Sequence, residues 1–365
     1  MSEAVIGIDK YEIDTPALLL DLDAMERNLK KMAKYFDDVE ANIRPHTKTQ
    51  KTPILAHKQI EAGAQGICCA KLGEAEVMIN AGIRDVLIAN QVVGRQKIER
   101  LIGLAQHSDV IVAVEDPINA EELSKAALKK GVKLNVVIEV EVGMGRCGTL
   151  PGEPTLPLAR KILKLEGLKF RGLMGYEGHC QYIQEFEKRK MECHKANKLL
   201  VDTKNALERN GVEVEIVSAG GTGTYNISGE YPGITEIEAG SYLTMDAKYS
   251  TIEGVDFECA MTILTTVINR PTDKRAVCDM GKKAATEEFG LPVIKGLEGI
   301  ELYSLSEEHG KIKLRETGID LKLGDKLEFI PSHGCTTINL HDKFFGVRNN
   351  KLEVVWDIQG RGKIR

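Results

Sequence analysis

Eight short apolar runs alternate with longer amphipathic segments between residues 43 and 239. Runs such as Val110–Val114 are apolar at every position, which is typical of parallel strands buried on both faces. The strands predicted from these runs are residues 43–48, 66–70, 85–89, 109–114, 133–141, 169–176, 213–219 and 235–239. Eight strand–helix units in about 200 residues favour a (β/α)8 TIM-like barrel, and a doubly wound open sheet is the alternative.

The segments between these runs have helical periodicity. Leu123, Ala126, Ala127 and Lys130 follow the i, i+3, i+4 spacing of a helix with one covered face. The predicted helices are residues 25–35, 73–81, 96–106, 117–130, 158–165 and 184–210, and another begins near Pro53.

The pattern changes near residue 250, where helical periodicity gives way to alternating and β-branched runs. The strands predicted there are residues 260–267, 275–279, 311–314, 326–330, 344–347 and 352–356. Residues 17–22 are also strand-like, and we expect them to pair with this second region. The sequence therefore predicts a barrel over residues 24–250 and an all-β domain made from residues 1–23 and 251–365.

The composition excludes several classes of protein. The formal net charge is −5 without a large basic block, which disfavours nucleic-acid binding. No apolar run approaches the roughly 18 residues that span a bilayer, and the first residues lack a secretory pattern. The eight cysteines have no regular spacing, as expected of reduced thiols. We therefore expect a cytoplasmic protein that binds neither membranes nor nucleic acid.

Lys48 ends the first predicted strand, in the stretch from Ile43 to Pro53. Barrel enzymes keep their reactive groups at the carboxyl ends of strands. A lysine held there can be desolvated, lose its proton near neutral pH and form a Schiff base. A solvated loop cation, a residue at a helix N-terminus and a phosphate contact are the other interpretations of Lys48.

Glycine-rich loops follow several later strands. Residues 218–224 and 239–242 follow the seventh and eighth strands, where barrel enzymes often bind phosphate, although ordinary turns would also use these residues. Residues 142–148 present Arg146, which suits a phenolate, phosphate or carboxylate unless it is a plain surface cation. Residues 176–181 follow the sixth strand and carry His179, a candidate general base or a histidine with a structural bond.

His333 and Cys335 lie in the second region of the chain. Because residues alternate along an extended segment, we expect both side chains on one face. Imidazole and thiolate together suit Zn²⁺, although two ligands leave the rest to water, substrate or another loop. A pair that binds no metal is the alternative.

These motifs, in this order, resemble the D-threonine aldolase and D-serine dehydratase family of alanine-racemase-like pyridoxal phosphate enzymes. The motifs are Pro-His-x-Lys-Thr at 45–49, Gly-Met-x-Arg-x-Gly at 143–148, Gly-Gly-Thr-Gly-Thr at 220–224 and Pro-x-His-x-Cys at 331–335. The likeness runs from about Asp14 to Ile358. It implies a barrel with a β domain, a homodimer, and a small D-3-hydroxy amino acid as substrate.

The resemblance also implies a role for each motif. Lys48 would carry the cofactor covalently, and Arg146 would lie against its phenolic oxygen. The remaining cofactor-binding residues would be Gly221, Thr222, Gly223, Gly240, Ser241 and Tyr242. His333 and Cys335 would bind a divalent metal, either Zn, Mn or Mg, and His179 and Tyr176 would work near the substrate hydroxyl. Gln50 departs from the pattern, since many relatives carry a second histidine there.

Glu238 stands where racemases of this fold place an arginine that faces the pyridine nitrogen. A carboxylate favours a protonated ring nitrogen, whereas an arginine disfavours it. A protonated ring is the stronger electron sink. We therefore predict a lyase and not a racemase.

The predicted activity is cleavage of a D-3-hydroxy amino acid such as D-threonine to glycine and an aldehyde, with the metal on the 3-hydroxyl and His179 as base. The alternative is a D-serine or D-3-hydroxyaspartate dehydratase that gives a 2-oxo acid and ammonia, with Lys48 removing the α-proton. The D configuration comes from the resemblance alone. The remaining alternatives are an amino-acid racemase, a pyridoxal phosphate carrier, and a cofactor-free Schiff-base aldolase acting on a sugar phosphate.

Overall fold

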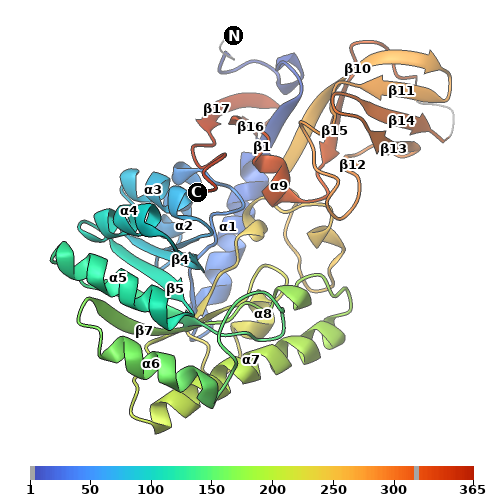
Figure 1. Ribbon diagram of the computed structural model, residues 1–365. Helices are drawn as coiled ribbons and strands as arrows, with labels where there is room; N and C mark the ends of the chain where they lie inside the picture. Colours follow the sequence, from blue (N-terminus) through green and yellow to red (C-terminus); the bar gives the residue numbers. More distant parts are fainter. Residues whose placement is uncertain (1–4, 316–319) are drawn as a thin grey trace.

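The computed structural model describes residues 5–315 and 320–365, which form a parallel eight-stranded sheet with helices and a separate nine-stranded, mostly antiparallel sheet (Figure 1). The predicted TIM-like barrel with an added β domain is confirmed. The limits predicted for the two domains, 24–250 on one side and 1–23 with 251–365 on the other, stay a prediction.

All eight predicted barrel strands are present, although most are shorter than expected. They are β2 (Asn42–Ile43), β3 (Ile67–Cys69), β4 (Asp85–Gln91), β5 (Asp109–Val114), β6 (Leu134–Glu139), β7 (Leu168–Met174), β8 (Ile216–Ala219) and β9 (Glu236–Ile237). Their order is β2-β9-β8-β7-β6-β5-β4-β3, and every neighbouring pair is parallel. The carboxyl ends of all eight strands therefore meet at one mouth.

The two outer strands of this sheet, β2 and β3, are joined by the chain that follows β2. The Cys68 amide donates to the Pro45 carbonyl at 2.9 Å, and the Thr47 amide donates to the Cys68 carbonyl at 2.7 Å. The prediction that the first strand reaches Lys48 is wrong, because β2 ends at Ile43 and the later residues form one isolated bridge. Pro45 has no amide proton to continue a ladder. Lys48 lies in the loop just beyond this closure.

Helices cover the outside of the barrel sheet, with α3 to α6 side by side in Figure 1. The main helices are α1 (Leu22–Asp37), α2 (Pro53–Glu61), α3 (Leu72–Asn80), α4 (Arg95–Ala105), α5 (Pro117–Lys129), α6 (Leu156–Leu163), α7 (Phe186–Arg209) and the short α8 (Tyr225–Ser228). Asp116 starts α5 by accepting from the amides of Ile118 and Asn119, with Pro117 in the first turn. Among the described residues, no helix combines the length and apolar character needed to cross a membrane.

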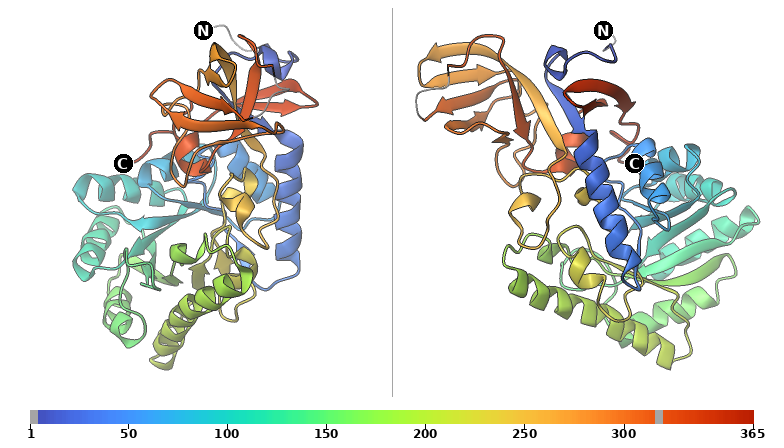
Figure 2. Two further views of the ribbon diagram at one scale, coloured as in Figure 1. Left: turned by 90° about the vertical axis from the view of Figure 1, so that its right-hand side faces the viewer. Right: turned by 180° about the vertical axis from the view of Figure 1, so that it is seen from behind.

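The β domain contains β1 (Ala17–Asp21), β10 (Met261–Thr272), β11 (Arg275–Cys278), β12 (Val293–Ile294), β13 (Ile300–Leu305), β14 (Gly310–Leu314), β15 (Lys326–Ile330), β16 (Lys343–Arg348) and β17 (Lys351–Asp357). As expected, β1 joins this sheet, antiparallel to β10 and parallel to β16. Figure 2 shows α1 running from β1 along the side of the barrel. Strands β12 and β13 were not predicted from the sequence.

Candidate active site

A cavity of about 240 Å³ lies at the carboxyl ends of the barrel strands. Lys48, Arg146, Tyr176 and Glu238 line it together with His46. These four predicted site residues come from four different loops or strand ends, as expected for the mouth of a barrel. The fold thus brings an amine, a guanidinium, a phenol and a carboxyl group to one space.

The amine of Lys48 approaches an aromatic ring and not a carboxylate. Its Nζ lies 5.1 Å from the centre of the Tyr176 ring, and the Arg146 Cζ lies 5.6 Å from the same ring. Within residues 5–315 and 320–365, the Lys48 amine forms no ion pair. An amine with no competing carboxylate suits condensation with an aldehyde cofactor.

The expectation that burial leaves Lys48 with a lowered pKa is wrong for this arrangement. Burial acts to lower the pKa of Lys48, but Tyr176, Cys335, Cys68 and Glu238, which can all become anionic, together raise it. Desolvation is opposed by nearby negative charge. Lys48 therefore needs more than burial to lose its proton near neutral pH.

Glu238 lies almost fully buried just past β9. Its Oε1 accepts from the Ser218 hydroxyl at 2.9 Å, and its Oε2 accepts from the Cys68 thiol at 3.3 Å. Burial raises the pKa of Glu238 from 4.5 to about 7, against these two hydrogen bonds, which lower it. Glu238 is thus a carboxyl group that can hold a proton at neutral pH inside the cavity.

The raised pKa of Glu238 makes stability depend on pH. Between pH 4.5 and about 7 the unfolded chain releases this proton while the folded chain keeps it, so the free energy of unfolding falls as pH rises. The total loss is about 3 kcal/mol, and it is complete above about pH 7. Urea unfolding of the cofactor-free protein and of Glu238→Gln at several pH values measures it, and stability curves that stay parallel across this window would contradict the prediction.

Arg146 is held by carboxylates on both its backbone and its side chain. Its amide donates to Glu141 at 3.0 Å, and its Nη2 lies 3.3 Å from Oε1 of the buried Glu139. Gln91 donates to the other oxygen of Glu139 at 2.5 Å. These contacts hold the Arg146 guanidinium at the side of the cavity, although the side chain is 44% exposed.

The loops predicted to bind phosphate lie beside the cavity, but their residues are not part of its lining. The Tyr242 amide donates to the Thr222 hydroxyl at 3.0 Å, and the Ser241 hydroxyl lies 3.4 Å from that of Thr49, next to Lys48. A Cβ at Gly221 would lie 2.6 Å from Gln181, and a Cβ at Gly240 would lie 2.2 Å from the His46 carbonyl. Packing within the protein thus accounts for these glycines, and the phosphate role of Gly221, Thr222, Gly223, Gly240, Ser241 and Tyr242 stays a prediction.

His179 and Tyr176 occupy different positions around the mouth. Tyr176 lines the cavity between Lys48 and Arg146, and burial raises the pKa of its phenol. His179 is exposed in the loop after β7 and packs against Gly143, where a Cβ would lie 3.0 Å from the imidazole. Gln50 is buried away from the cavity and bonds Gln59. The catalytic roles of His179 and Tyr176 stay predictions.

His333 and Cys335 lie at the junction of the two domains, where Figure 1 shows α9 (Gly334–Ile338). The expected extended segment is wrong, because His333 is extended but Cys335 lies in the first turn of α9. The two side chains are nevertheless in hydrogen-bond contact. The Cys335 Sγ lies 3.2 Å from the hydroxyl of Thr49, which places the pair beside the Lys48 loop.

Asp246 supports this pair and was not predicted from the sequence. Its fully buried carboxylate accepts from His333 Nδ1 at 3.2 Å and from the Gly334 amide at 2.9 Å. Burial would lower the pKa of His333, but bonds to Asp246 and Cys335 raise it to about 10. Burial would raise the pKa of Cys335, but His333 and Lys48 lower it. A thiolate next to an imidazole oriented by a carboxylate is a donor set that fits a divalent metal.

Two groups of three metal-capable side chains occur in the described part of the chain. They are His46, Cys68 and Glu238, and Glu115, Glu139 and Cys147. His333 and Cys335 belong to neither group. A metal on His333 and Cys335 would take its other ligands from water, substrate or another loop, and this stays a prediction.

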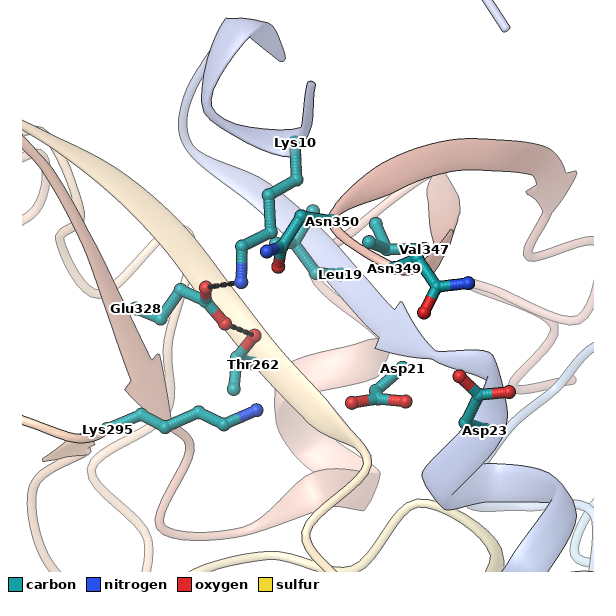
Figure 3. A pocket seen from close by; sticks show the side chains of 10 residues that line it. All are labelled: Lys10, Leu19, Asp21, Asp23, Thr262, Lys295, Glu328, Val347, Asn349 and Asn350. Carbon is teal, nitrogen blue, oxygen red and sulfur yellow. Dashed lines mark hydrogen bonds and ion pairs between the residues drawn. The ribbon is translucent and has the colours of Figure 1, made fainter. Parts of the chain in front are cut away.

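Two further cavities lack these features. One, of about 500 Å³, is lined by aromatic residues such as Tyr35, Tyr225 and Tyr231. The other, of about 200 Å³, lies in the β domain. There the Glu328 carboxylate forms an ion pair with Lys10 and accepts a hydrogen bond from the Thr262 hydroxyl (Figure 3). Neither cavity lies at the barrel mouth, so the cavity that holds Lys48 is the candidate active site although the aromatic one is larger.

Two family models match the chain. The alanine racemase N-terminal domain matches residues 20–248, and a putative serine dehydratase domain matches residues 260–347. The two matches cover the barrel, the end of β1 and the larger part of the β domain.

Three known proteins are similar over nearly the whole chain. A 3-hydroxy-D-aspartate aldolase of Paracoccus denitrificans is 38% identical, covering 99% of this chain and 95% of the relative. The crystal structure of D-threonine aldolase from Filomicrobium marinum has a TM-score of 0.97 and 38% identity, covering 99% of this chain and all of that one. The third is D-threo-3-hydroxyaspartate dehydratase of Delftia sp., in the metal-free form of a cysteine-to-alanine variant. Its structure has a TM-score of 0.87 and 25% identity, covering 96% of this chain and 98% of that one.

Proposed function

Because this chain belongs to the alanine-racemase-like family of D-threonine aldolases and D-serine dehydratases, we propose that it is a lyase dependent on pyridoxal phosphate and a divalent metal, which cleaves a D-3-hydroxy amino acid to glycine and an aldehyde. The observation that carries the proposal is the contact between Thr49 and Cys335. Through it the candidate cofactor lysine of the barrel and the metal pair of the β domain form one site.

The cavity residues fit the parts of the cofactor. Lys48 offers a free amine to the aldehyde, Arg146 a guanidinium to the phenolic oxygen, and Glu238 a carboxyl to the ring nitrogen. Thr222 and Ser241 offer hydroxyls for the phosphate from loops that adjoin Lys48. When bound, pyridoxal phosphate supplies the electron sink for the electron pair released at Cα.

The protein's own groups would move the protons. Glu238 would share a proton with the ring nitrogen, because its pKa is about 7. His179 would take the proton of the substrate 3-hydroxyl, directly or through water, and the protonated Lys48 amine would deliver a proton to Cα after the carbon–carbon bond breaks. Tyr176 separates the Lys48 and Arg146 cations within the cavity.

The metal pair is proposed to hold the substrate 3-hydroxyl and to make its proton more acidic. The Cys335 thiolate and His333 imidazole are suited to Zn²⁺, and a site completed by water also admits Mn²⁺ or Mg²⁺.

Product analysis with D-threonine tests the proposed reaction. Glycine and acetaldehyde formed in the presence of Mn²⁺ or Zn²⁺ support the aldolase, and EDTA should abolish turnover until metal is restored. Formation of 2-oxobutanoate and ammonia would instead identify a dehydratase. One relative is a D-threo-3-hydroxyaspartate dehydratase. Cofactor binding without turnover of any 3-hydroxy amino acid would identify a carrier, and chelator-insensitive interconversion of alanine enantiomers a racemase.

Asp246→Asn tests how the metal pair is supported. Because Asp246 orients His333 through Nδ1, the change should weaken metal affinity by about 10- to 100-fold. Titration of the metal-free protein with Zn²⁺ measures the effect, and excess metal should restore much of the activity. Cys259→Ser serves as control, since its thiol donates to the backbone carbonyl of Asp246. If the metal affinity of Asp246→Asn is unchanged, His333 is not a metal ligand that Asp246 orients.

A homodimeric state and a cytoplasmic location complete the proposal. The dimer is carried over from the family. The location is supported by the eight cysteines, all of which are free thiols.

A further inference from the structure

Phe289 is held against the metal pair by the turn that carries it. This turn, residues 286–290 between β11 and β12, is hydrogen-bonded to the segment that contains His333 and Cys335. The bonds run from the Thr286 amide to the Thr337 hydroxyl at 3.3 Å, from the Ser332 hydroxyl to the Thr286 carbonyl at 3.2 Å, and from the Thr336 hydroxyl to Glu288 at 3.0 Å. The position of Phe289 is therefore coupled to that of His333.

The backbone of Phe289 is unfavourable for its residue type. Its φ is +65°, in the left-handed region that a bulky L residue rarely adopts. The residue is 49% exposed, so burial does not compensate for the strain. Strained residues persist mostly where their position serves binding or catalysis, which makes Phe289 a candidate for such a role.

The Phe289 ring forms a wall with two tyrosines of the barrel side. It meets the His333 ring edge-on with centres 5.1 Å apart, and the Tyr182 ring lies 4.7 Å away. Tyr249 continues the wall at 4.9 Å from Tyr182. The Phe289–Tyr182–Tyr249 wall thus joins the two domains on one side of the metal pair.

The charge next to this wall is negative. Glu287 and Glu288 directly precede Phe289 in the chain. Glu287 is paired with Lys282 at 2.7 Å, whereas Glu288 has no cationic partner among the described residues and accepts from Thr336. A carboxylate brought to this wall would meet aromatic rings and an uncompensated glutamate, which disfavours it.

We infer that Phe289 and Tyr182 contact the substituent on C3 of the substrate, and that the enzyme prefers D-3-hydroxy amino acids whose substituent is uncharged and apolar or aromatic over those with an acidic one. The inference rests on the proposed function, because a metal on His333 and Cys335 that holds the 3-hydroxyl brings the substituent of the same carbon next to His333. An aromatic substituent can stack on the wall, and a methyl group fills less of it.

Relative specificity of the unmodified holoenzyme is the first test. The value of kcat/KM for D-phenylserine should exceed that for D-3-hydroxyaspartate by about tenfold or more, a usual span for side-chain selection by an apolar pocket. Equal values, or a preference for 3-hydroxyaspartate, would overturn the inference while the aldolase proposal stands. Cleavage of neither substrate nor of D-threonine would overturn the proposed function itself.

Phe289→Gly removes the aromatic ring and relieves the backbone strain, so it distinguishes the effect of the ring on specificity from the effect of the strain on stability. Glycine accepts the left-handed backbone, so the melting temperature should stay equal or rise, while kcat/KM for D-phenylserine falls about tenfold and that for D-threonine by less than about threefold. Asn350→Gly is the matched control, because Asn350 also has a positive φ, at +60°, but lies in the β16–β17 turn. It should leave the substrate ratio unchanged.

Binding gives a readout that is independent of turnover. Calorimetry of D-phenylserine with metal-loaded Lys48→Ala protein should show weaker binding when Phe289→Gly is added. If Phe289→Gly does not fold, Phe289→Asn, which also tolerates this backbone, takes its place. A variant that lowers the melting temperature but keeps the ratio of kcat/KM values would show a merely structural role for Phe289 and overturn the inference.

Discussion

Sodium borohydride reduction of the pyridoxal phosphate-loaded protein is expected to fix the cofactor to Lys48, and Lys48→Ala is expected to lower kcat by about 10³-fold or more. The reason is that Lys48 supplies the one lysine amine that lines the cavity, close to the Tyr176 ring, with no carboxylate paired to it in the described structure. Peptide mapping of the reduced protein and steady-state kinetics of the variant measure the two effects.

Lys51 provides an internal control for this experiment. It lies three residues from Lys48 and is buried, but its amine is paired with Glu74. A reagent that labelled lysines by proximity alone would mark both residues, whereas a Schiff base specific to the cavity marks Lys48. Label on another residue, or no label at all, would end the assignment of Lys48 as the cofactor lysine.

Glu238→Arg is expected to abolish lyase turnover, and Glu238→Gln to lower kcat by about 10²-fold or more. An arginine would disfavour the protonated ring nitrogen, and an amide could not hold the proton that Glu238 keeps with a pKa of about 7. Cofactor affinity should change much less than kcat, since Lys48 and the loops proposed to bind phosphate remain. Kinetics with D-threonine and the absorbance of the bound cofactor separate the two quantities.

Glu236→Gln is the matched control for this substitution. Glu236 lies two residues earlier in β9 and is also buried, but both its oxygens lie 3.0 Å from Nε of Arg44, away from the Lys48 cavity. The control should reduce stability, because it weakens a buried ion pair, and should leave kcat nearly unchanged. Lyase turnover that survived Glu238→Arg would show that the carboxylate does not select the reaction.

The barrel was predictable because its information is local. Apolar runs such as β5 and amphipathic helices such as α5 show their periodicity within a few residues, and both have nearly the predicted ends. The loops that carry Lys48, Arg146 and Tyr176 follow strands of one parallel sheet, so their convergence followed from the fold class. Glu238 was predicted from the resemblance, as the residue that stands where racemases of this fold place an arginine, and it lines the same cavity.

The features that were missed depend on contacts between distant segments. Asp246 meets His333 from 87 positions away, and no spacing rule connects them. The helix α9 was not predicted because five residues are too few for a periodic signal. Strand β13 was missed although its burial alternates for most of its length. Phe289 became a candidate for substrate contact because of its positive φ, and sequence patterns do not encode this angle.

The stretch between β9 and β10, which includes Asp246, is also the crossing from the barrel to the β domain. A small rotation of one domain against the other would pull Asp246 from His333 and Thr49 from Cys335 at the same time. The angle between the domains therefore sets the geometry of the candidate active site. Substitutions at the domain junction are then expected to change both the metal affinity and the turnover proposed for this site.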